Sequence, residues 1–236
     1  MDSNALFSAL VQLLLLWLSI SLHEAAHAWT ASACGDPTAR EMGRATLNPL
    51  RHLDVLGSVL FPMLLLAFGV IVPVFGTLVF FGWGRPTPVL EEKLRRPNWD
   101  GVLVLASGSL ANLVVAGLAT VALVLAIGSL GEPARQAALL ALVDRPGVEH
   151  SGAFPVMFTL VRLATINAFL AAFNLIPLPP LDGGQIALRL LPPDWAERLA
   201  ALRPYGFMIG VLTAMALLPL LFVVIGSLLN LVIQFS

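Results

Sequence analysis

The chain contains Ser19-Ile20-Ser21-Leu22-His23-Glu24-Ala25-Ala26-His27, a stretch with the pattern His-Glu-x-x-His. On a helix, residues four positions apart lie on one face, so the imidazoles of His23 and His27 can bind the same metal ion. Glu24 lies beside them, where it can exchange a proton with a water molecule instead of binding the metal itself. The pattern therefore predicts a metal centre with hydrolytic chemistry.

The setting of this stretch strengthens the prediction. Residues 5–20, just upstream, are almost wholly apolar, as in a helix that enters a membrane. A charged side chain at mid-membrane costs about 2.5–3.5 kcal/mol on insertion scales, and a bound metal would offset that cost. In soluble helices most matches to so short a pattern are accidents. Because His and Glu are rare in apolar spans, chance is the poorer explanation here.

The composition is that of a membrane protein. Of the 236 residues, 58% are hydrophobic and 11% are charged, and the mean hydropathy is +0.89, whereas a soluble domain has about 25% charged residues. The net charge of −1 gives no indication of a nucleic-acid partner. The single cysteine, Cys34, excludes an internal disulfide. We expect a multi-pass protein of the cell membrane that contacts the lipid bilayer and binds no nucleic acid.

Five apolar segments are long enough to cross a bilayer, which needs about 20 helical residues. They are residues 5–33, 56–81, 101–130, 154–178 and 205–235. The expected fold class is an all-α polytopic membrane protein with about four to five transmembrane helices. Because no repeat or long linker divides the chain, we expect one membrane-embedded domain over residues 1–236. Its catalytic core would cover about 5–190, followed by a C-terminal helix at 205–235.

Helix breakers mark exceptions to this pattern. The segment 56–81 contains Pro62 and Pro73 among several glycines, so we expect it to be broken or re-entrant, with its backbone covered by protein. Residues 79–90 are rich in Phe, Val and Thr, with Gly and Pro between them. This composition is compatible with a short β hairpin whose edge pairs with an unwound substrate. Pro219 predicts a kink in the last segment.

A second motif follows the fourth apolar segment, namely Asn174-Leu175-Ile176-Pro177-Leu178-Pro179-Pro180-Leu181-Asp182-Gly183-Gly184. Its prolines end the helix, so Asp182 stands on irregular backbone, before two glycines that allow a close approach of the chain. A catalytic zinc needs three protein ligands and an open fourth position. Asp182 is therefore either the third ligand beside the two histidines or an ordinary turn residue before Gly-Gly.

Together, the two motifs resemble those of the site-2 protease family of intramembrane zinc metalloproteases, in its compact subgroup without a PDZ domain. The resemblance covers residues from about 19 to 190 and includes three intervening pieces. They are Gly43-Arg44-Ala45-Thr46-Leu47-Asn48-Pro49-Leu50-Arg51-His52-Leu53-Asp54, Phe81-Gly82-Trp83-Gly84-Arg85-Pro86-Thr87-Pro88-Val89 and Gly108-Ser109-Leu110-Ala111-Asn112. The family usually has Gly-Pro-Leu where this chain has Gly108-Ser109-Leu110. The resemblance therefore predicts no particular backbone conformation at these three residues.

The resemblance implies that His23, His27 and Asp182 bind one zinc ion and that Glu24 is the catalytic acid/base. It also implies that Asn174 lines the site, where its amide could donate a hydrogen bond to a developing oxyanion. The implied activity is cleavage of peptide bonds in single-span membrane proteins, that is, regulated intramembrane proteolysis. A substrate helix hides its carbonyl groups in internal hydrogen bonds, so it must unwind locally. Gly, Pro or Asn near the cut would favour this unwinding.

The metal site constrains how the chain crosses the membrane. His27 lies near the end of the first apolar segment and Asp182 lies just after the fourth, so both segments must end at the same side. The chain must then cross an odd number of times between residues 33 and 154, where two apolar segments lie. We therefore expect the segment 56–81 to enter the membrane and return.

Charge supports this topology. If residues 56–81 return, the side where the first segment ends carries ten basic residues and the opposite side carries two, whereas a full crossing gives five against seven. The ten are Arg40, Arg44, Arg51, Arg85, Lys93, Arg95, Arg96, Arg189, Arg198 and Arg203, and the two are Arg135 and Arg145. The positive-inside rule favours the asymmetric arrangement. We expect the site to be reached from the cytoplasm and both chain ends to lie outside.

Three other functions share parts of this pattern. Some zinc transporters carry His-Glu-x-x-His on a membrane helix, but they need more polar residues on a partner helix than Asn112 and the Ser and Thr residues of 101–130 provide. A non-catalytic relative would bind membrane segments without cutting them, although every catalytic position is present here. Membrane metalloproteases that cut soluble or prenylated peptides usually take a Glu as third ligand, where this chain offers Asp182.

Some polar residues have more than one interpretation. Asn112 makes either an interhelical hydrogen bond or a substrate contact. His52 is structural, or it belongs to a gate or supports the metal ligands. Arg162, at the start of the fourth segment, is expected to extend its guanidinium to the membrane interface.

Overall fold

The structure is a computed structural model that describes residues 3–71, 82–132, 154–206 and 208–213, with Ala216, Val223 and Ser227. Three of its helices are long and apolar enough to cross a membrane. They are α1 (Ser3–Ala33), α5 (Pro97–Leu130) and α7 (Phe154–Asn174). The described residues thus confirm the predicted all-α membrane fold. Most of the predicted last segment, including Pro219, lies outside them.

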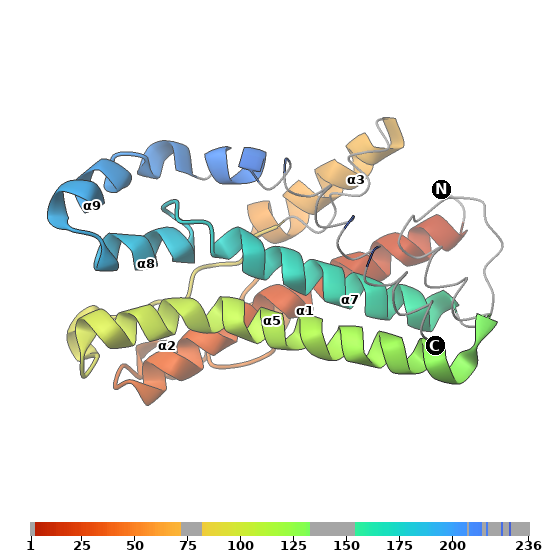
Figure 1. Cartoon of the computed structure of the whole chain (residues 1–236), viewed down its shortest axis with the longest axis horizontal. Coiled ribbons are helices and arrows are strands. Elements are labelled where there is room, and N and C mark those ends of the chain that lie inside the picture. Colours follow the sequence, from red (N-terminus) through yellow and green to blue (C-terminus); the bar gives the residue numbers. More distant parts are fainter. Residues whose placement is uncertain are drawn as a thin grey trace.

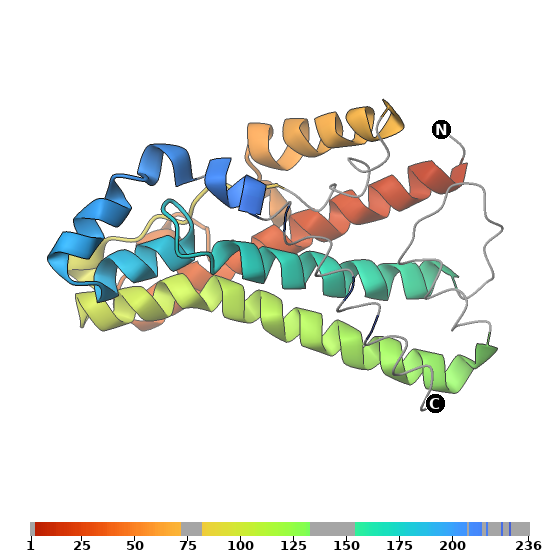
Figure 2. The same ribbon diagram turned by 45° about the horizontal axis from the view of Figure 1, so that its top comes forward.

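The three long helices lie side by side (Figure 1). α5 packs along α7 and α1, and α1 also contacts α7. α1 runs towards the left of Figure 1, α5 runs back to the right, and α7 returns to the left. The short helices α2 (Thr38–Glu41), α8 (Asp182–Leu190) and α9 (Pro193–Ala200) lie at that left end, as the turned view in Figure 2 also shows. α1 and α7 therefore end on the same side, as the predicted metal site requires.

Apolar side chains hold the three helices together. The buried ones include Leu16, Ile20, Ile166 and Leu170 between α1 and α7, and Leu123, Ile127, Phe154 and Phe158 between α5 and α7. Leu10, Leu14 and Leu18 recur every four residues on the outer face of α1 and are exposed. Because a membrane helix meets lipid on its outer face, this stripe is expected to contact acyl chains.

The segment 56–81 is irregular at its start. It begins as a π-helical stretch, Val55–Leu60, in which the amides of Leu56 and Gly57 donate to the Asp54 carboxylate at 3.0 and 2.8 Å. The chain then continues as α3 (Phe61–Ile71). Residues 72–81 lie outside the part of the chain that the structure describes.

Where the description of the chain resumes, Trp83 contacts the π-helical stretch Val55–Leu60. The amide of Trp83 donates to the carbonyl oxygen of Gly57 at 3.3 Å, and the Ser58 hydroxyl donates to the Trp83 carbonyl oxygen at 2.7 Å. A Cβ at Gly57 would lie 2.3 Å from the Trp83 ring, so the glycine permits this contact. Residue 83 therefore lies against residue 57, and the re-entrant course of 56–81 stays a prediction, because residues 72–81 are not described.

Residues 82–90 are extended and pass over α1. Gly84 forms an isolated antiparallel bridge with Leu53, and a Cβ at Gly84 would lie 2.6 Å from Ile20 Cγ2 and 3.5 Å from Glu24 Cγ. The predicted hairpin at 79–90 begins among residues that the structure does not describe, and within 82–90 the bridge at Gly84 pairs with Leu53. The extended stretch thus covers the face of α1 that carries the first motif.

Candidate metal centre

His23 and His27 point from one face of α1 into the helix bundle. Each residue is 7% exposed, and the two ring centroids lie 4.7 Å apart with the ring planes at 86°. The four-residue spacing therefore places both imidazoles on one side of the helix, as predicted.

A proline-rich turn connects α7 to α8 and places Asp182 at the first position of α8. α8 begins directly against this turn. A Cβ at Gly183 would lie 2.3 Å from the Leu175 carbonyl oxygen, and one at Gly184 would lie 2.2 Å from the Leu178 carbonyl carbon. Because glycine has no Cβ, the Gly-Gly pair allows α8 to begin directly against the turn that follows α7, and α8 packs along α5. This placement brings the Asp182 carboxylate to the two histidines of α1.

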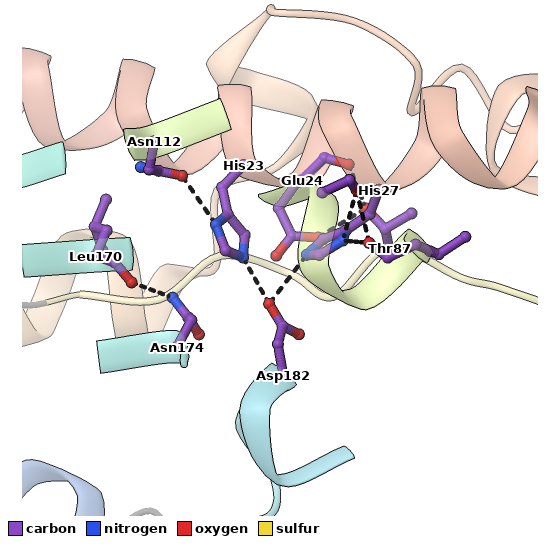
Figure 3. A network of polar contacts seen from close by, with 10 residues as sticks. His23, Glu24, His27, Thr87, Asn112, Leu170, Asn174 and Asp182 are labelled. Atoms are coloured by element: carbon purple, nitrogen blue, oxygen red, sulfur yellow. Dashed lines mark hydrogen bonds and ion pairs between the residues drawn. The ribbon is translucent and has the colours of Figure 1, made fainter. Parts of the chain in front are cut away.

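The three predicted ligands meet, as Figure 3 shows. Asp182 Oδ2 lies 3.1 Å from His23 Nε2 and 3.3 Å from His27 Nε2, and one ligand atom from each residue lies within 4.8 Å of the others. Tetrahedral zinc with bonds of about 2.0–2.1 Å separates its ligand atoms by about 3.3 Å. Two imidazole nitrogens and one carboxylate oxygen at these distances are a donor set that fits zinc.

One stripe of α5 supports the two histidines. Val104, Gly108 and Asn112 are spaced by four residues and face α1. The Val104 carbonyl oxygen lies 2.6 Å from His27 Nδ1, and Asn112 Oδ1 lies 2.9 Å from His23 Nδ1. Because both partners are hydrogen-bond acceptors, each Nδ1 carries the proton and each Nε2 offers its lone pair to a metal.

Gly108 leaves the space that the imidazoles occupy. A Cβ there would lie 2.6 Å from His27 Nε2 and 2.7 Å from His23 Nε2. The ligand atoms therefore sit in a recess of α5 that any larger residue would fill. α5 is continuous through Ser109, so the departure from Gly-Pro-Leu noted in the sequence leaves a regular helix at this point.

A chain of amides extends behind His23. Asn112 Nδ2 donates to Asn167 Oδ1 at 3.0 Å, and Asn167 Nδ2 donates to Ser19 Oγ at 2.8 Å. All three side chains are buried. These contacts determine which end of the Asn112 amide faces His23, because its NH2 group is turned towards Asn167. Of the two interpretations of Asn112, the structure shows the interhelical hydrogen bond, which is directed at His23.

A cleft of about 470 Å³ opens beside the three ligand residues. Its lining includes His23, Glu24, Asn174 and Asp182 together with Ile20, Gly82, Trp83, Gly84, Pro86, Leu170, Phe173, Pro180 and Leu181. Burial acts to raise the pKa of the Asp182 carboxyl, and the two imidazoles, where their Nε2 atoms are protonated, lower that pKa below its ordinary value. A metal at this place would take the position of those protons and would bind the ionised carboxylate.

The predicted catalytic residues share this cleft with the ligands. The Glu24 carboxylate accepts a hydrogen bond from the Thr87 hydroxyl at 2.7 Å. Asn174 Nδ2 donates to the Leu170 carbonyl oxygen at 2.9 Å, which leaves a second N–H on the same nitrogen for a bound molecule. The structure thus brings all five predicted site residues to one place.

Two other polar residues lie apart from the cleft lining. His52 is fully buried, with Nε2 placed 2.8 Å from the Thr46 carbonyl oxygen, and burial lowers its pKa. Arg162 is 1% exposed and lies over the Phe158 ring, 5.0 Å from its centroid. The expectation that Arg162 extends to the interface is therefore wrong, because its guanidinium lies on an aromatic face inside the bundle.

Sequence reasoning did not identify the partners of the predicted residues. Asn167 offered a signal, since an amide in an apolar helix needs a hydrogen-bonding partner. Thr87 offered a weaker one, because a threonine between two prolines is common in ordinary loops. The contact between Val104 and His27 uses a main-chain carbonyl, which any residue provides.

Comparison with known proteins places the chain near membrane metalloproteases. The sequence model of peptidase family M50 matches residues 11–218. "Putative zinc metalloprotease YwhC" of Bacillus subtilis is 34% identical over 195 residues, which are 81% of this chain and 74% of that protein. "Putative zinc metalloprotease Rip2" of Mycolicibacterium smegmatis is 29% identical over 199 residues, 83% of this chain, and the chain spans 63% of its length. No solved structure matches the chain significantly.

Proposed function

The chain belongs to peptidase family M50, whose members are membrane metalloproteases, and on this premise we propose that it cuts peptide bonds of membrane-spanning substrates within the bilayer. One observation carries the proposal. The two imidazoles on the membrane helix α1 and the Asp182 carboxylate converge beside a cleft that also contains Glu24. In this proposal His23, His27 and Asp182 hold one zinc ion.

Each residue of the site has a defined task in this mechanism. Held by His23, His27 and Asp182, a zinc ion would supply a Lewis acid for the attacking water and the peptide carbonyl. Glu24 takes a proton from the attacking water and passes it to the leaving amine, so it acts first as a base and then as an acid. Asn174 lines the cleft, and in this mechanism its second N–H stabilises negative charge on the carbonyl oxygen. Asn112 and the Val104 carbonyl keep the imidazoles in the tautomer that binds metal.

The lining of the cleft supports a membrane segment as substrate. Apolar side chains such as Leu170, Phe173 and Leu181 surround the polar groups. An apolar peptide that enters the cleft therefore exchanges its contacts with lipid for contacts with these side chains. The peptide must be unwound to expose its carbonyl groups. Single-span membrane proteins with Gly, Pro or Asn near the cut fit these requirements.

The extended residues 84–90 offer a place for the unwound peptide. Pro86 and Pro88 have no N–H, and the Arg85 amide already donates to the His52 carbonyl oxygen at 2.7 Å. Within the described ranges the amides of Thr87 and Val89 make no hydrogen bond. We propose that these two amides pair with substrate backbone, as in strand addition.

Charge supports a cytoplasmic opening and a location in the cell membrane. The loops and short helices at the end of the bundle where α1 and α7 finish carry nearly all the basic residues of the described chain, including Arg44, Arg85 and Arg189. By the positive-inside rule this end faces the cytoplasm. Water would reach the cleft from that side.

The decisive experiment is co-expression of the protein with a panel of single-span substrates, read out by fragment size. Glu24→Gln should abolish cleavage, because glutamine cannot accept the proton, while zinc content and thermal stability stay as in the wild type. Glu92→Gln, on an exposed carboxylate outside the cleft, is the matched control and should cut normally. Turnover retained by Glu24→Gln would contradict the assignment.

The alternative functions give different results in the same system. A zinc transporter would carry zinc into vesicles made with the purified protein, and that flux would not depend on a cleavable substrate. A non-catalytic relative would bind the substrates of the panel and release them uncut in both the wild type and Glu24→Gln.

A further inference from the structure

We propose that Thr87 is a positioning residue for Glu24, whose hydroxyl fixes one carboxylate oxygen so that the other is presented to the cleft. The inference rests on the proposed proteolysis, because it concerns the group that moves the proton in that reaction. Thr87 lies 63 positions from Glu24 in the sequence, yet its hydroxyl contacts both the side chain and the main chain of that residue.

The geometry favours the carboxylate as the acceptor. Thr87 Oγ1 lies 2.7 Å from Glu24 Oε2 and 3.0 Å from the Glu24 carbonyl oxygen. A hydroxyl has one proton, and an ionised oxygen at the shorter distance is the stronger acceptor. The Glu24 carboxylate makes no other hydrogen bond within the described ranges. Thr87 is therefore the contact that selects one orientation of a side chain with several rotatable bonds.

The backbone holds the threonine in place. Pro86 and Pro88 flank it, so the φ angles of both neighbours are fixed and Thr87, which precedes a proline, is restricted to extended conformations. On one side, the Arg44 guanidinium donates to the carbonyl oxygens of Arg85 and Pro86. On the other side, the Leu90 amide donates to Asp36 Oδ2 at 2.7 Å.

The side chain of Glu24 thus lies between its own helix, α1, and the stiff segment 84–90. Gly84, at the start of that segment, approaches the Glu24 stem so closely that an added Cβ would lie 3.5 Å from Glu24 Cγ. Glu24 and Pro86 both line the cleft. The segment that is proposed to receive the substrate therefore also orients the general base, so binding and catalysis share one rigid support.

The test compares full-length purified variants that differ at the hydroxyl. Thr87→Val removes the hydroxyl at nearly constant shape, whereas Thr87→Ser keeps it. Thr87→Val should lower kcat about tenfold or more with KM and zinc content unchanged, because an aligned base matters in the transition state and not in substrate binding. Thr87→Ser should stay within about threefold of the wild type. Thr120→Val, at an exposed threonine that bonds to the Ala116 carbonyl within α5, is the control and should leave all values unchanged.

A binding measurement separates positioning from a structural role. A hydroxamate binds zinc through its two oxygens and gives its acidic proton to a neighbouring carboxylate, so its affinity reports the placement of Glu24. Thr87→Val should weaken hydroxamate binding in the wild-type background and have no further effect in Glu24→Gln, which is the signature of coupling in a double-mutant cycle. If Thr87→Val does not fold, Thr87→Ala takes its place in the same cycle.

Two results would overturn the inference. One is an equal loss of kcat in Thr87→Val and Thr87→Ser, and the other is the same loss of hydroxamate affinity with and without the Glu24 carboxylate. Failure of the proposed function looks different. A wild type that binds neither zinc nor hydroxamate, or a Glu24→Gln variant that still cuts, contradicts the proteolytic assignment itself.

Discussion

Asn112 Oδ1 lies 2.9 Å from His23 Nδ1, so a side chain on α5 determines which nitrogen of the His23 imidazole, a proposed metal ligand on α1, is free. The two residues are 89 positions apart in the sequence. The contact links the metal centre to the packing of the helices, because Asn112 can reach His23 only while α5 stays in register with α1. Zinc affinity should therefore respond to changes on α5 that touch no metal ligand.

Replacing Asn112 with leucine tests this relationship. The variant should bind zinc about 10- to 100-fold more weakly, the usual effect of removing a hydrogen bond behind a metal ligand. Asn112→Asp, which keeps an acceptor for the His23 proton, should retain more affinity than the leucine variant. The measurement is zinc release to a competing chelator, with Ser129→Ala, at an exposed serine of the same helix, as control. Equal affinities in the leucine variant and the wild type would show that the contact does not orient His23.

Gly108 provides a steric test of the same centre. Gly108→Ala should lose bound zinc, because the new Cβ would stand 2.6 Å from His27 Nε2 and 2.7 Å from His23 Nε2. Gly117→Ala, nine residues along the same helix, is the matched control, since its Cβ would meet nothing within 4 Å. That control should hold one zinc per chain and gain about 0.5–1 kcal/mol from the better helix propensity of alanine. Elemental analysis of the purified proteins measures the zinc content of each variant. A Gly108→Ala variant that holds one zinc per chain would contradict the proposed metal site.

The two histidines of the candidate metal site could be identified because the sequence carries their chemistry locally. His23 and His27 lie one helical turn apart, so the helix alone aligns them. For Asp182 the residues alone left two interpretations, a third ligand or a turn residue, and only the resemblance to the site-2 protease family assigned it as a ligand. The expectation of a re-entrant segment rests on the requirement that α1 and α7 end on one side. The structure places His23, His27 and Asp182 together and ends both helices on one side, with Trp83 against Gly57. The re-entrant course of 56–81 stays a prediction, because residues 72–81 lie outside the described part of the chain.

The supporting contacts could not be predicted, for a physical reason. Asn112, Val104 and Thr87 reach their partners across helices or loops, and their contacts depend on the rotation and register of elements that sequence periodicity does not fix. A hydroxyl or a main-chain carbonyl is also too common to mark its own role. Arg162 shows the opposite error. A long charged side chain in a membrane helix was assigned to the interface, whereas packing against Phe158 keeps it inside.

His52 gives the stability a pH dependence. Burial lowers its pKa below the ordinary value of 6.5, and the nearby Arg44 charge acts in the same direction, while Glu24 opposes it. The unfolded chain then binds more protons than the folded one as the pH falls below about 6.5, so stability should decrease on acidification from neutral pH. His52→Gln, which can still donate to the Thr46 carbonyl, should have a smaller decrease in Tm between pH 7.5 and pH 5. An identical decrease in both proteins would show that His52 is not the group responsible.

Val89 tests whether the substrate backbone pairs with the extended segment. A proline at position 87 would remove the Thr87 hydroxyl together with its amide, so Val89→Pro is the cleaner variant. It removes one free N–H and should raise KM about three- to tenfold, as expected for one lost hydrogen bond, with kcat and zinc content nearly unchanged. Val89 also packs beside the cluster of Ala31, Leu94 and Val104, so Val89→Ala is needed as control, because it loses side-chain contacts but keeps the amide. Pairing through the backbone predicts a normal KM for the alanine variant, whereas equal KM values in the two variants would assign the effect to packing and remove the support for strand addition at this edge.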